Sequence, residues 1–253
     1  MAHLGQKYSK MTSDQAKIHM KNTIIQIHRF LVDQSFYPIA LSTSYALALY
    51  AGRVLGSGAW VVYFNLVWNL VLAWIPFSFS MLADGLHRLY PRQWWWLVPP
   101  GVIWLLFFPN APYILTDFFH LEPRYGSPLW YDMLLLIVFS FTGIFLAVAS
   151  LRTMQRLVSS YAGKYVGWAF AIFALVLGGV GIYLGRFERW NSWDMLTQPE
   201  RILADLLAPM TDPLNSLRFF GFSSLFTVFL LICYMMFATM RRPDERIVSK
   251  VGD

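Results

Sequence analysis

Apolar residues along this chain occur in long blocks rather than at the one-sided spacing of a soluble helix. Six blocks approach the roughly 20 residues that a helix needs to cross a bilayer. They cover Phe36–Ala51, Val61–Leu82, Trp94–Leu115, Trp130–Leu151, Tyr165–Gly185 and Leu217–Met240. The pattern predicts an all-α integral membrane protein, a bundle of about six transmembrane helices.

The composition favours a membrane protein over a soluble helical domain. Of the 253 residues, 57% are hydrophobic and 13% are charged, whereas a soluble domain carries about 25% charged residues. The polar, basic start of the chain lacks the apolar core of a cleavable signal peptide, so none is expected. No basic patch is interleaved with base-stacking aromatic residues, and no nucleic-acid partner is expected.

The positions of lysine and arginine predict the orientation, because cytoplasmic loops are enriched in both. With both termini inside, the inner segments hold all six lysines and 14 of the 20 basic residues. We expect an N-in, C-in topology with a cytoplasmic basic amphipathic helix (1–34), a six-span domain (35–240) and a cytoplasmic basic tail (241–253). The partners are then the lipid bilayer and, through the net charge of +6, anionic lipid at the inner face.

Two further helices are predicted outside the spans. Four apolar residues from Met20 to Leu31 recur at helical spacing, which predicts an amphipathic helix over residues 12–33. This helix would lie on the inner membrane surface or pack on the inner loops as a soluble tail. Between the fifth and sixth spans, a capping-box pattern that starts at Thr197 predicts a short helix over 198–208 on the outer surface.

The segment Phe108–Leu121 ends the third apolar block with polar residues. If it is helical, four of them share one face because they are spaced by three, four and three positions: Asn110, Tyr113, Asp117 and His120. Pro109 and Pro112 lack a backbone N–H, so two carbonyl groups of the preceding turn lose their helical donors. Unpaired polar groups are costly in lipid, and the segment therefore indicates a site.

Three other outer segments supply side chains to face this stripe: the starts of spans two and four, and the loop after span five. Their candidate residues are Asn65, Asn69, Tyr131, Asp132, Arg186, Arg189, Trp190, Asn191, Trp193 and Asp194. We expect the carboxylates of Asp117 and Asp132 to pair with the arginines of that loop. Gly181 and Gly185 form a small-xxx-small pair, which predicts the close approach of another helix.

Two interpretations of the polar cluster stay open. It forms either an outward-facing pocket or a structural network of ion pairs that holds the outer helix ends together. In a catalytic pocket, His120 would act as general acid or base, oriented by Asp117 or Asp132. Arg186 and Arg189 would hold an anionic group, and the remaining candidates would contact the substrate.

The sequence assigns no metal site and names no cofactor. The other four histidines are expected inside, so His120 stands alone and a zinc site built from several histidines is disfavoured. A hard cation held by Asp117, Asp132 and Asn110 stays open. The deep middle of every span lacks ionisable residues, which speaks against ion-coupled transport.

Several motifs occur together in the middle of the chain. They are Phe108–Tyr113 with Thr116–Asp117 and His120–Leu121, then Trp130–Asp132, Gly185–Phe187 and Arg189–Asp194. These motifs resemble those of the bacterial membrane proteins grouped as domain of unknown function 1361, over about residues 60–195. The resemblance implies a multi-pass protein of a bacterial cell membrane with no established activity.

We therefore expect a polytopic cell-membrane protein whose extracytoplasmic polar pocket binds or modifies a lipid-linked or cell-envelope substrate. Whether the protein is an enzyme stays open. One alternative is a non-enzymatic scaffold or partner subunit, in which the polar cluster is a clamp. Another is a small-solute transporter.

Overall fold

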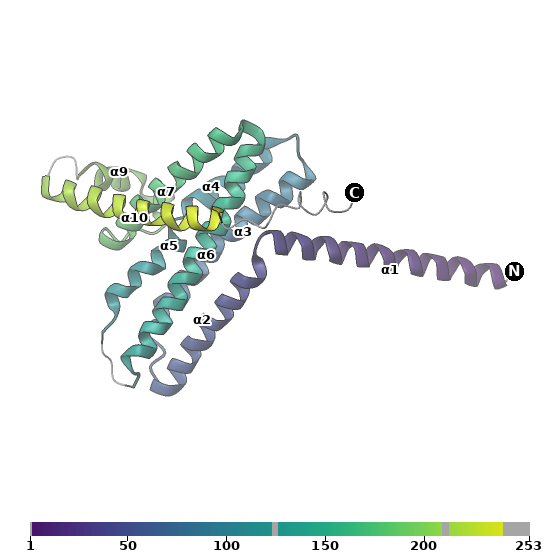
Figure 1. Ribbon diagram of the computed structural model, residues 1–253, viewed down its shortest axis with the longest axis horizontal. Coiled ribbons are helices and arrows are strands. Elements are labelled where there is room, and N and C mark those ends of the chain that lie inside the picture. Colours follow the sequence, from purple (N-terminus) through teal and green to yellow (C-terminus); the bar gives the residue numbers. More distant parts are fainter. Residues whose placement is uncertain (1, 123–125, 209–212, 240–253) are drawn as a thin grey trace, which may run out of the picture. The chain divides into compact units, whose positions relative to one another are not determined.

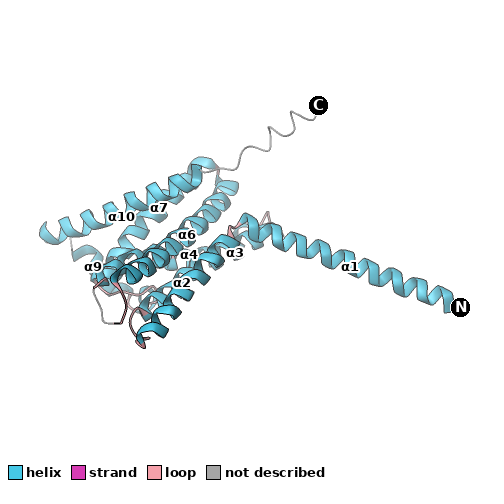
Figure 2. Ribbon diagram, turned by 60° about the horizontal axis from the view of Figure 1, so that its bottom comes forward, coloured by secondary structure: helices cyan, strands magenta, loops and turns pink. Residues whose placement is uncertain are grey.

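The computed structural model describes residues 2–122, 126–208 and 213–239, and every regular element in these ranges is a helix (Figures 1 and 2). The elements are α1 (Ala2–Asp33), α2 (Phe36–Ser57), α3 (Phe64–Leu89), η1 (Trp94–Leu97), α4 (Val98–Phe107), α5 (Asn110–Tyr113), η2 (Ile114–His120), α6 (Leu129–Ala162), α7 (Lys164–Phe187), α8 (Asp194–Thr197), α9 (Pro199–Leu207) and α10 (Pro213–Thr239). The predicted tail at 241–253 lies outside the described residues.

Five helical segments in the described ranges are long and apolar enough to cross a membrane. They are Phe64–Leu89, Trp94–His120, Leu129–Ala162, Lys164–Phe187 and Ser216–Phe237. These segments coincide with the second to sixth predicted spans. The chain is thus an all-helical protein with five candidate membrane-spanning helices.

The first predicted span forms α2, but its serine, threonine and arginine residues make it less apolar than those five. These polar residues contact α6. Ser42 Oγ lies 2.6 Å from Thr142 Oγ1, and Arg53 pairs with Asp132. From Ser42 on, α2 therefore runs antiparallel to α6 for about ten residues, or roughly 15 Å. A sixth span and the N-in, C-in orientation stay predictions.

The chain divides into two compact units, residues 1–41 and 42–253. In the first unit, the predicted amphipathic helix is confirmed as a helix and begins at Ala2 rather than at residue 12. His28 Nδ1 lies 2.9 Å from the Tyr37 hydroxyl, which joins the end of α1 to the first turn of α2. Met20 and Ile24 of the apolar stripe are exposed.

The second unit is a helical bundle in which α6 packs between α3 and α7, and α10 lies along α7 (Figures 1 and 2). Its core is aromatic and aliphatic. Trp104 of α4 is fully buried, and its ring centroid lies 4.9 Å from that of Phe108. Phe139 and Leu136 of α6 are also fully buried.

The third apolar segment is not one continuous α-helix. α4 ends at Phe107, the short helix α5 follows Pro109, and η2 continues as a 3₁₀ helix to His120. Both α5 and η2 pack against α6. The predicted span Trp94–Leu115 is therefore a broken helix that extends five residues further, to His120.

The short helix predicted after the fifth span is present as α9. The capping-box prediction is wrong, because Thr197 Oγ1 bonds back to the Trp193 carbonyl at 3.4 Å and the N-cap residue is Gln198, without a side-chain cap. The helix is held by packing instead. Ile202 is buried in an apolar cluster with Tyr183 of α7 and other residues of α7 and α10.

Polar contacts join the helices at both ends of the bundle. At one end, which we call the Asp84 end, Asp84 of α3 accepts hydrogen bonds from Arg88 and Arg156, each at 2.9 Å. His87 lies 2.7 Å from the Tyr161 hydroxyl beside them. The other end, which we call the Asp117 end, carries the predicted site.

Candidate functional site

The chain breaks its helix at Pro109 and repairs the lost hydrogen bonds locally. The carbonyl of Phe108, which lacks its usual donor because residue 112 is proline, accepts from the Ala111 N–H at 3.3 Å. The side-chain amide of Asn110 donates to the Phe107 carbonyl at 3.1 Å. Asn110 is thereby fixed in orientation at the corner of the break.

Glycines on two neighbouring helices let the broken segment pack closely. A Cβ added to Gly181 of α7 would come within 2.6 Å of Pro109 Cγ. A Cβ added to Gly143 of α6 would come within 2.3 Å of the Ala111 carbonyl oxygen. The predicted close approach at the α7 glycines is therefore confirmed, and its partner is the broken segment.

A cavity of about 290 Å³ lies where the broken segment, α3 and the loop after α7 meet, and we call it the Asn110 cavity. Its polar lining comes from Asn69, Asn110, Tyr113, Arg189, Trp190, Asn191 and Ser192. Its apolar lining includes Trp68, Leu72, Leu106, Leu184, Met195 and Ile202. No carboxylate lines it among the residues that the structure describes.

Hydrogen bonds hold the polar walls of this cavity in place. Asn110 Nδ2 donates to Ser192 Oγ at 2.7 Å, which ties the broken segment to the loop after α7. Trp190 Nε1 donates to Asp205 Oδ2 of α9 at 2.7 Å. The loop is therefore anchored on both sides of Asn191.

A second cavity, of about 230 Å³, adjoins the first, and we call it the His120 cavity. It is lined by Val61, Val62, Tyr63, Asn65, Leu66, Asp117 and His120. Asp117 is 5% exposed and accepts a hydrogen bond from Asn69 Nδ2 at 2.9 Å. Since Asn69 lines the Asn110 cavity and Asp117 the His120 cavity, this bond lies between the two. Asp117 thus bonds Asn69 rather than an arginine.

Arg186 contacts the imidazole of His120 and not a carboxylate. Arg186 Nη1 lies 3.0 Å from His120 Nε2, and its guanidinium lies 5.0 Å from the centroid of the Phe119 ring. An arginine can only donate, so in this contact Nε2 accepts and its lone pair is occupied by the Arg186 N–H.

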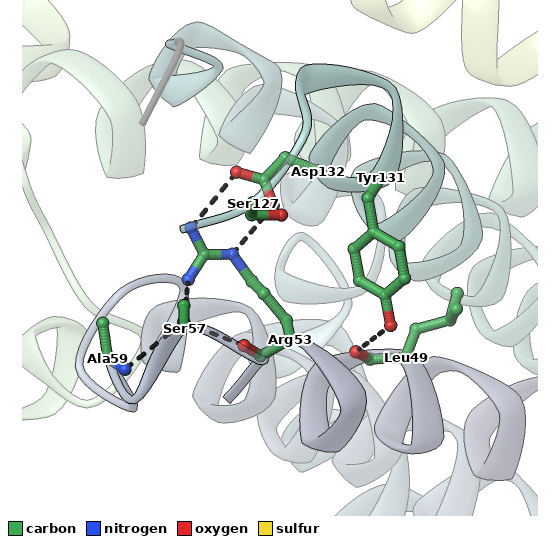
Figure 3. A network of polar contacts seen from close by, with 7 residues as sticks. All are labelled: Leu49, Arg53, Ser57, Ala59, Ser127, Tyr131 and Asp132. Carbon is green, nitrogen blue, oxygen red and sulfur yellow. Dashed lines mark hydrogen bonds and ion pairs between the residues drawn. The ribbon is translucent and has the colours of Figure 1, made fainter. Parts of the chain in front are cut away.

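Asp132 forms a buried ion pair with Arg53 (Figure 3). Arg53 Nε and Nη2 donate to its two carboxylate oxygens at 2.8 and 3.2 Å, and both side chains are 1% exposed. Ser127 Oγ adds a hydrogen bond at 2.9 Å, and the Tyr131 hydroxyl donates to the Leu49 carbonyl. The predicted pairing of Asp132 with an arginine after span five is wrong, because its partner is Arg53 of α2.

The predicted residues therefore fall into three groups. Those that line the two cavities are Asn65, Asn69, Asn110, Tyr113, Asp117, His120, Arg189, Trp190 and Asn191. Tyr131 and Asp132 belong to the contact with α2. Arg186, Trp193 and Asp194 line neither cavity: Arg186 contacts His120, and the Asp194 carboxylate accepts from the Asn191 N–H at 2.8 Å. The candidate catalytic residue Asp132 thus stands apart from His120.

The residues at the Asp117 end that the sequence prediction missed include Trp68 and Arg53. Trp68 lines the Asn110 cavity, and its signal was its position directly before Asn69 at the polar start of α3. Arg53 follows the first predicted span, which ends at Ala51, and so falls in a predicted outer loop, whereas it lies inside α2. An arginine at the end of an apolar block is itself a signal for a buried acidic partner.

A group of three or more histidine, cysteine, aspartate or glutamate residues that could hold a metal ion is not found in the described part of the chain. Asp117 and Asp132, which the hard-cation alternative places together, have separate partners in Asn69 and Arg53.

A family model described as "Protein of unknown function (DUF1361)" matches residues 68–233. No curated protein and no solved structure matches. The matched residues include the broken segment, the lining of the Asn110 cavity and Asp132. Of the His120 cavity lining they include Asp117 and His120, and they exclude its residues before position 68 as well as Arg53.

Proposed function

We propose a binding function for this chain, which belongs to the DUF1361 family of proteins of unknown function. The Asn110 cavity would hold the polar head group of a lipid-linked or cell-envelope substrate. The observation that carries the proposal is the cavity itself, which has polar residues on the broken segment and the loop after α7, and leucines on α3, α4 and α7. Such a mixed lining suits an amphiphilic molecule.

The location of the cavity supports this proposal. It lies at the Asp117 end of helices that are apolar enough to cross a membrane. The lysine and arginine distribution predicts that this end faces outward. A lipid-linked molecule would therefore reach the cavity from the outer leaflet, with its chain along the apolar helix surfaces.

Binding is better supported than acid–base catalysis. His120 and Asp117 remain the candidates for proton transfer, because both line the adjoining His120 cavity. However, His120 Nε2 accepts from Arg186, and Asp117 accepts from Asn69. A general base needs a lone pair that is open to its substrate. We therefore assign these two residues to shaping the wall between the cavities.

A matched pair of adjacent substitutions tests the proposal. Met195 lines the Asn110 cavity, whereas its neighbour Leu196 is 76% exposed and does not. Protein purified from its own membranes is examined by native mass spectrometry for a bound amphiphile. Met195→Trp should fill the cavity and remove the bound molecule, and Leu196→Trp should retain it. Equal retention by both variants, or no bound molecule in the wild type, would refute the proposal.

A scaffold function is the second candidate, and the Arg53–Asp132 pair favours it. This pair is buried, and neither Arg53 nor Asp132 lines a cavity, although the Arg53 guanidinium lies 5.0 Å from the centroid of the Tyr63 ring at the His120 cavity. The pair holds α2 against α6. In a pure scaffold, substitutions in the Asn110 cavity would lower function only as far as they lower stability. Loss of function at unchanged melting temperature would contradict that candidate.

A further inference from the structure

The Asn110 cavity contains one charged side chain, Arg189. Two other arginines at this end have partners: Arg53 bonds Asp132, and Arg186 bonds His120. Arg189 has no hydrogen-bond or ion-pair partner among the residues that the structure describes. Its backbone has a left-handed conformation with φ 59°. This cation is therefore available to an anionic group in the cavity.

Three asparagines add hydrogen-bond acceptors. Asn69 Nδ2 donates to Asp117, Asn110 Nδ2 donates to Ser192, and Asn191 Nδ2 donates to Asp194. Because each amide nitrogen donates to another protein side chain, the amide oxygens face away from these bonds as acceptors. None of the three oxygens has a hydrogen-bond partner within the described residues. Three acceptor oxygens complement a ligand that carries hydroxyl donors.

Two tryptophans complete the lining. Trp68 is 49% exposed, so part of its ring is open to a ligand. The Trp190 ring is fixed by the hydrogen bond from its Nε1 to Asp205. A flat apolar ring beside hydrogen-bonding groups suits the face of a sugar ring, which carries C–H groups on its surface and hydroxyls at its edge.

The size of the cavity agrees with such a ligand. Its 290 Å³ correspond to about ten water molecules at about 30 Å³ each. That space suits a monosaccharide-sized group.

We propose that the Asn110 cavity binds a sugar that carries a phosphate group, with Arg189 on the phosphate and the three asparagine oxygens on the sugar hydroxyls. The inference rests on the proposed binding function and names its ligand class. The sugar phosphate is either free in solution or the head group of a lipid, and the chemistry that recognises it is the same.

The test measures binding to full-length protein in lipid nanodiscs by thermal shift and calorimetry. Four probes are compared: glucose 6-phosphate, glucose, inorganic phosphate, and glucose joined through phosphate to a polyprenyl chain placed in the nanodisc. We expect one or both sugar phosphates to bind more tightly than glucose or inorganic phosphate. Binding of only the polyprenyl probe would identify a lipid-linked ligand, and binding of glucose 6-phosphate would identify a soluble one.

Arginine variants locate the site. Arg189→Gln should weaken binding of the sugar phosphate by about tenfold to a hundredfold, the effect of losing one charge-assisted hydrogen bond. The matched control is Arg201→Gln, since Arg201 is exposed, bonds Gln198 and lies outside the cavity lining. Arg189→Lys should restore part of the affinity.

Three results would overturn the inference: no binding of either sugar phosphate, equal binding of glucose and its phosphate, or unchanged binding by Arg189→Gln. None of these would remove an amphiphile that co-purifies with the wild type and is lost in Met195→Trp. The ligand class and the binding function therefore fail separately.

Discussion

Pro109 of the broken segment lies directly against Gly181 of α7, so that a Cβ at position 181 would come within 2.6 Å of the proline Cγ. A proline ring has little freedom to move aside, and the nearest atoms belong to the corner that positions Asn110. The presence of glycine at 181 is therefore a condition for the shape of the Asn110 cavity.

Gly181→Ala should destabilise the protein by about 1–3 kcal/mol, the usual cost of adding a methyl group to a packed contact. The matched control is Gly221→Ala in α10, where no atom lies within 4 Å of the added Cβ. Alanine favours a helix by about 1 kcal/mol over glycine, so the control should be neutral or stabilising. Melting temperatures in detergent compare the two. A Gly181→Ala variant as stable as the control would contradict the close packing.

Asp132→Ala should cost about 3–5 kcal/mol, because it leaves the buried Arg53 guanidinium without its carboxylate. Arg53→Met should be similarly costly. The double variant should lose less than the sum of the two, since it leaves no unpaired buried charge. Thermal or denaturant unfolding of the four proteins gives the coupling energy, and additive losses would show that the pair is not coupled.

Asn69→Leu should destabilise the protein by about 1–3 kcal/mol, because the buried carboxylate of Asp117 loses its amide donor. In a protein of this size, this corresponds to a melting temperature lower by about 2–4 °C per kcal/mol. Asn65→Leu, one turn earlier on α3 and exposed, should stay within about 0.5 kcal/mol. Equal effects of the two changes would argue against the hydrogen bond.

Single cysteines test the predicted orientation on a Cys233→Ala background. In intact cells, a membrane-impermeant thiol reagent should label Glu188→Cys after α7, and it should label Lys164→Cys only after permeabilisation. Both positions are exposed. Lys21→Cys in α1 should behave like Lys164→Cys if α2 crosses the membrane. Labelling of Lys21→Cys from outside would mean that α2 does not cross.

The helices were predictable because an uninterrupted apolar block of about 20 residues is typical of a membrane-spanning helix and is longer than the core of a soluble protein requires. The five most apolar blocks all form helices of spanning length. The break at Pro109 was also visible, since proline removes a backbone donor in any helix. The local sequence pattern did not predict that the chain continues as a 3₁₀ helix after Tyr113. This 3₁₀ helix, η2, packs against α6.

The sequence predicted which residues line the cavity better than it predicted which side chains pair with one another. Asn69, Asn110 and Arg189 do line one cavity. Partners depend on which helices are neighbours, and helix order in space is not encoded in spacing along the chain. Asp132 pairs with Arg53 across 79 positions of sequence, and no local rule selects that arginine over Arg186 in the last turn of α7 or Arg189 in the loop after it.

The same ion pair sets a limit on where the family domain can be cut. The family match begins at residue 68 and includes Asp132, but Arg53 precedes it. A fragment trimmed to 68–233 would carry a carboxylate in a buried position with nothing to neutralise it. A segment keeps this ion pair only if it begins upstream of Arg53, and the compact unit that starts at Ser42 meets this condition.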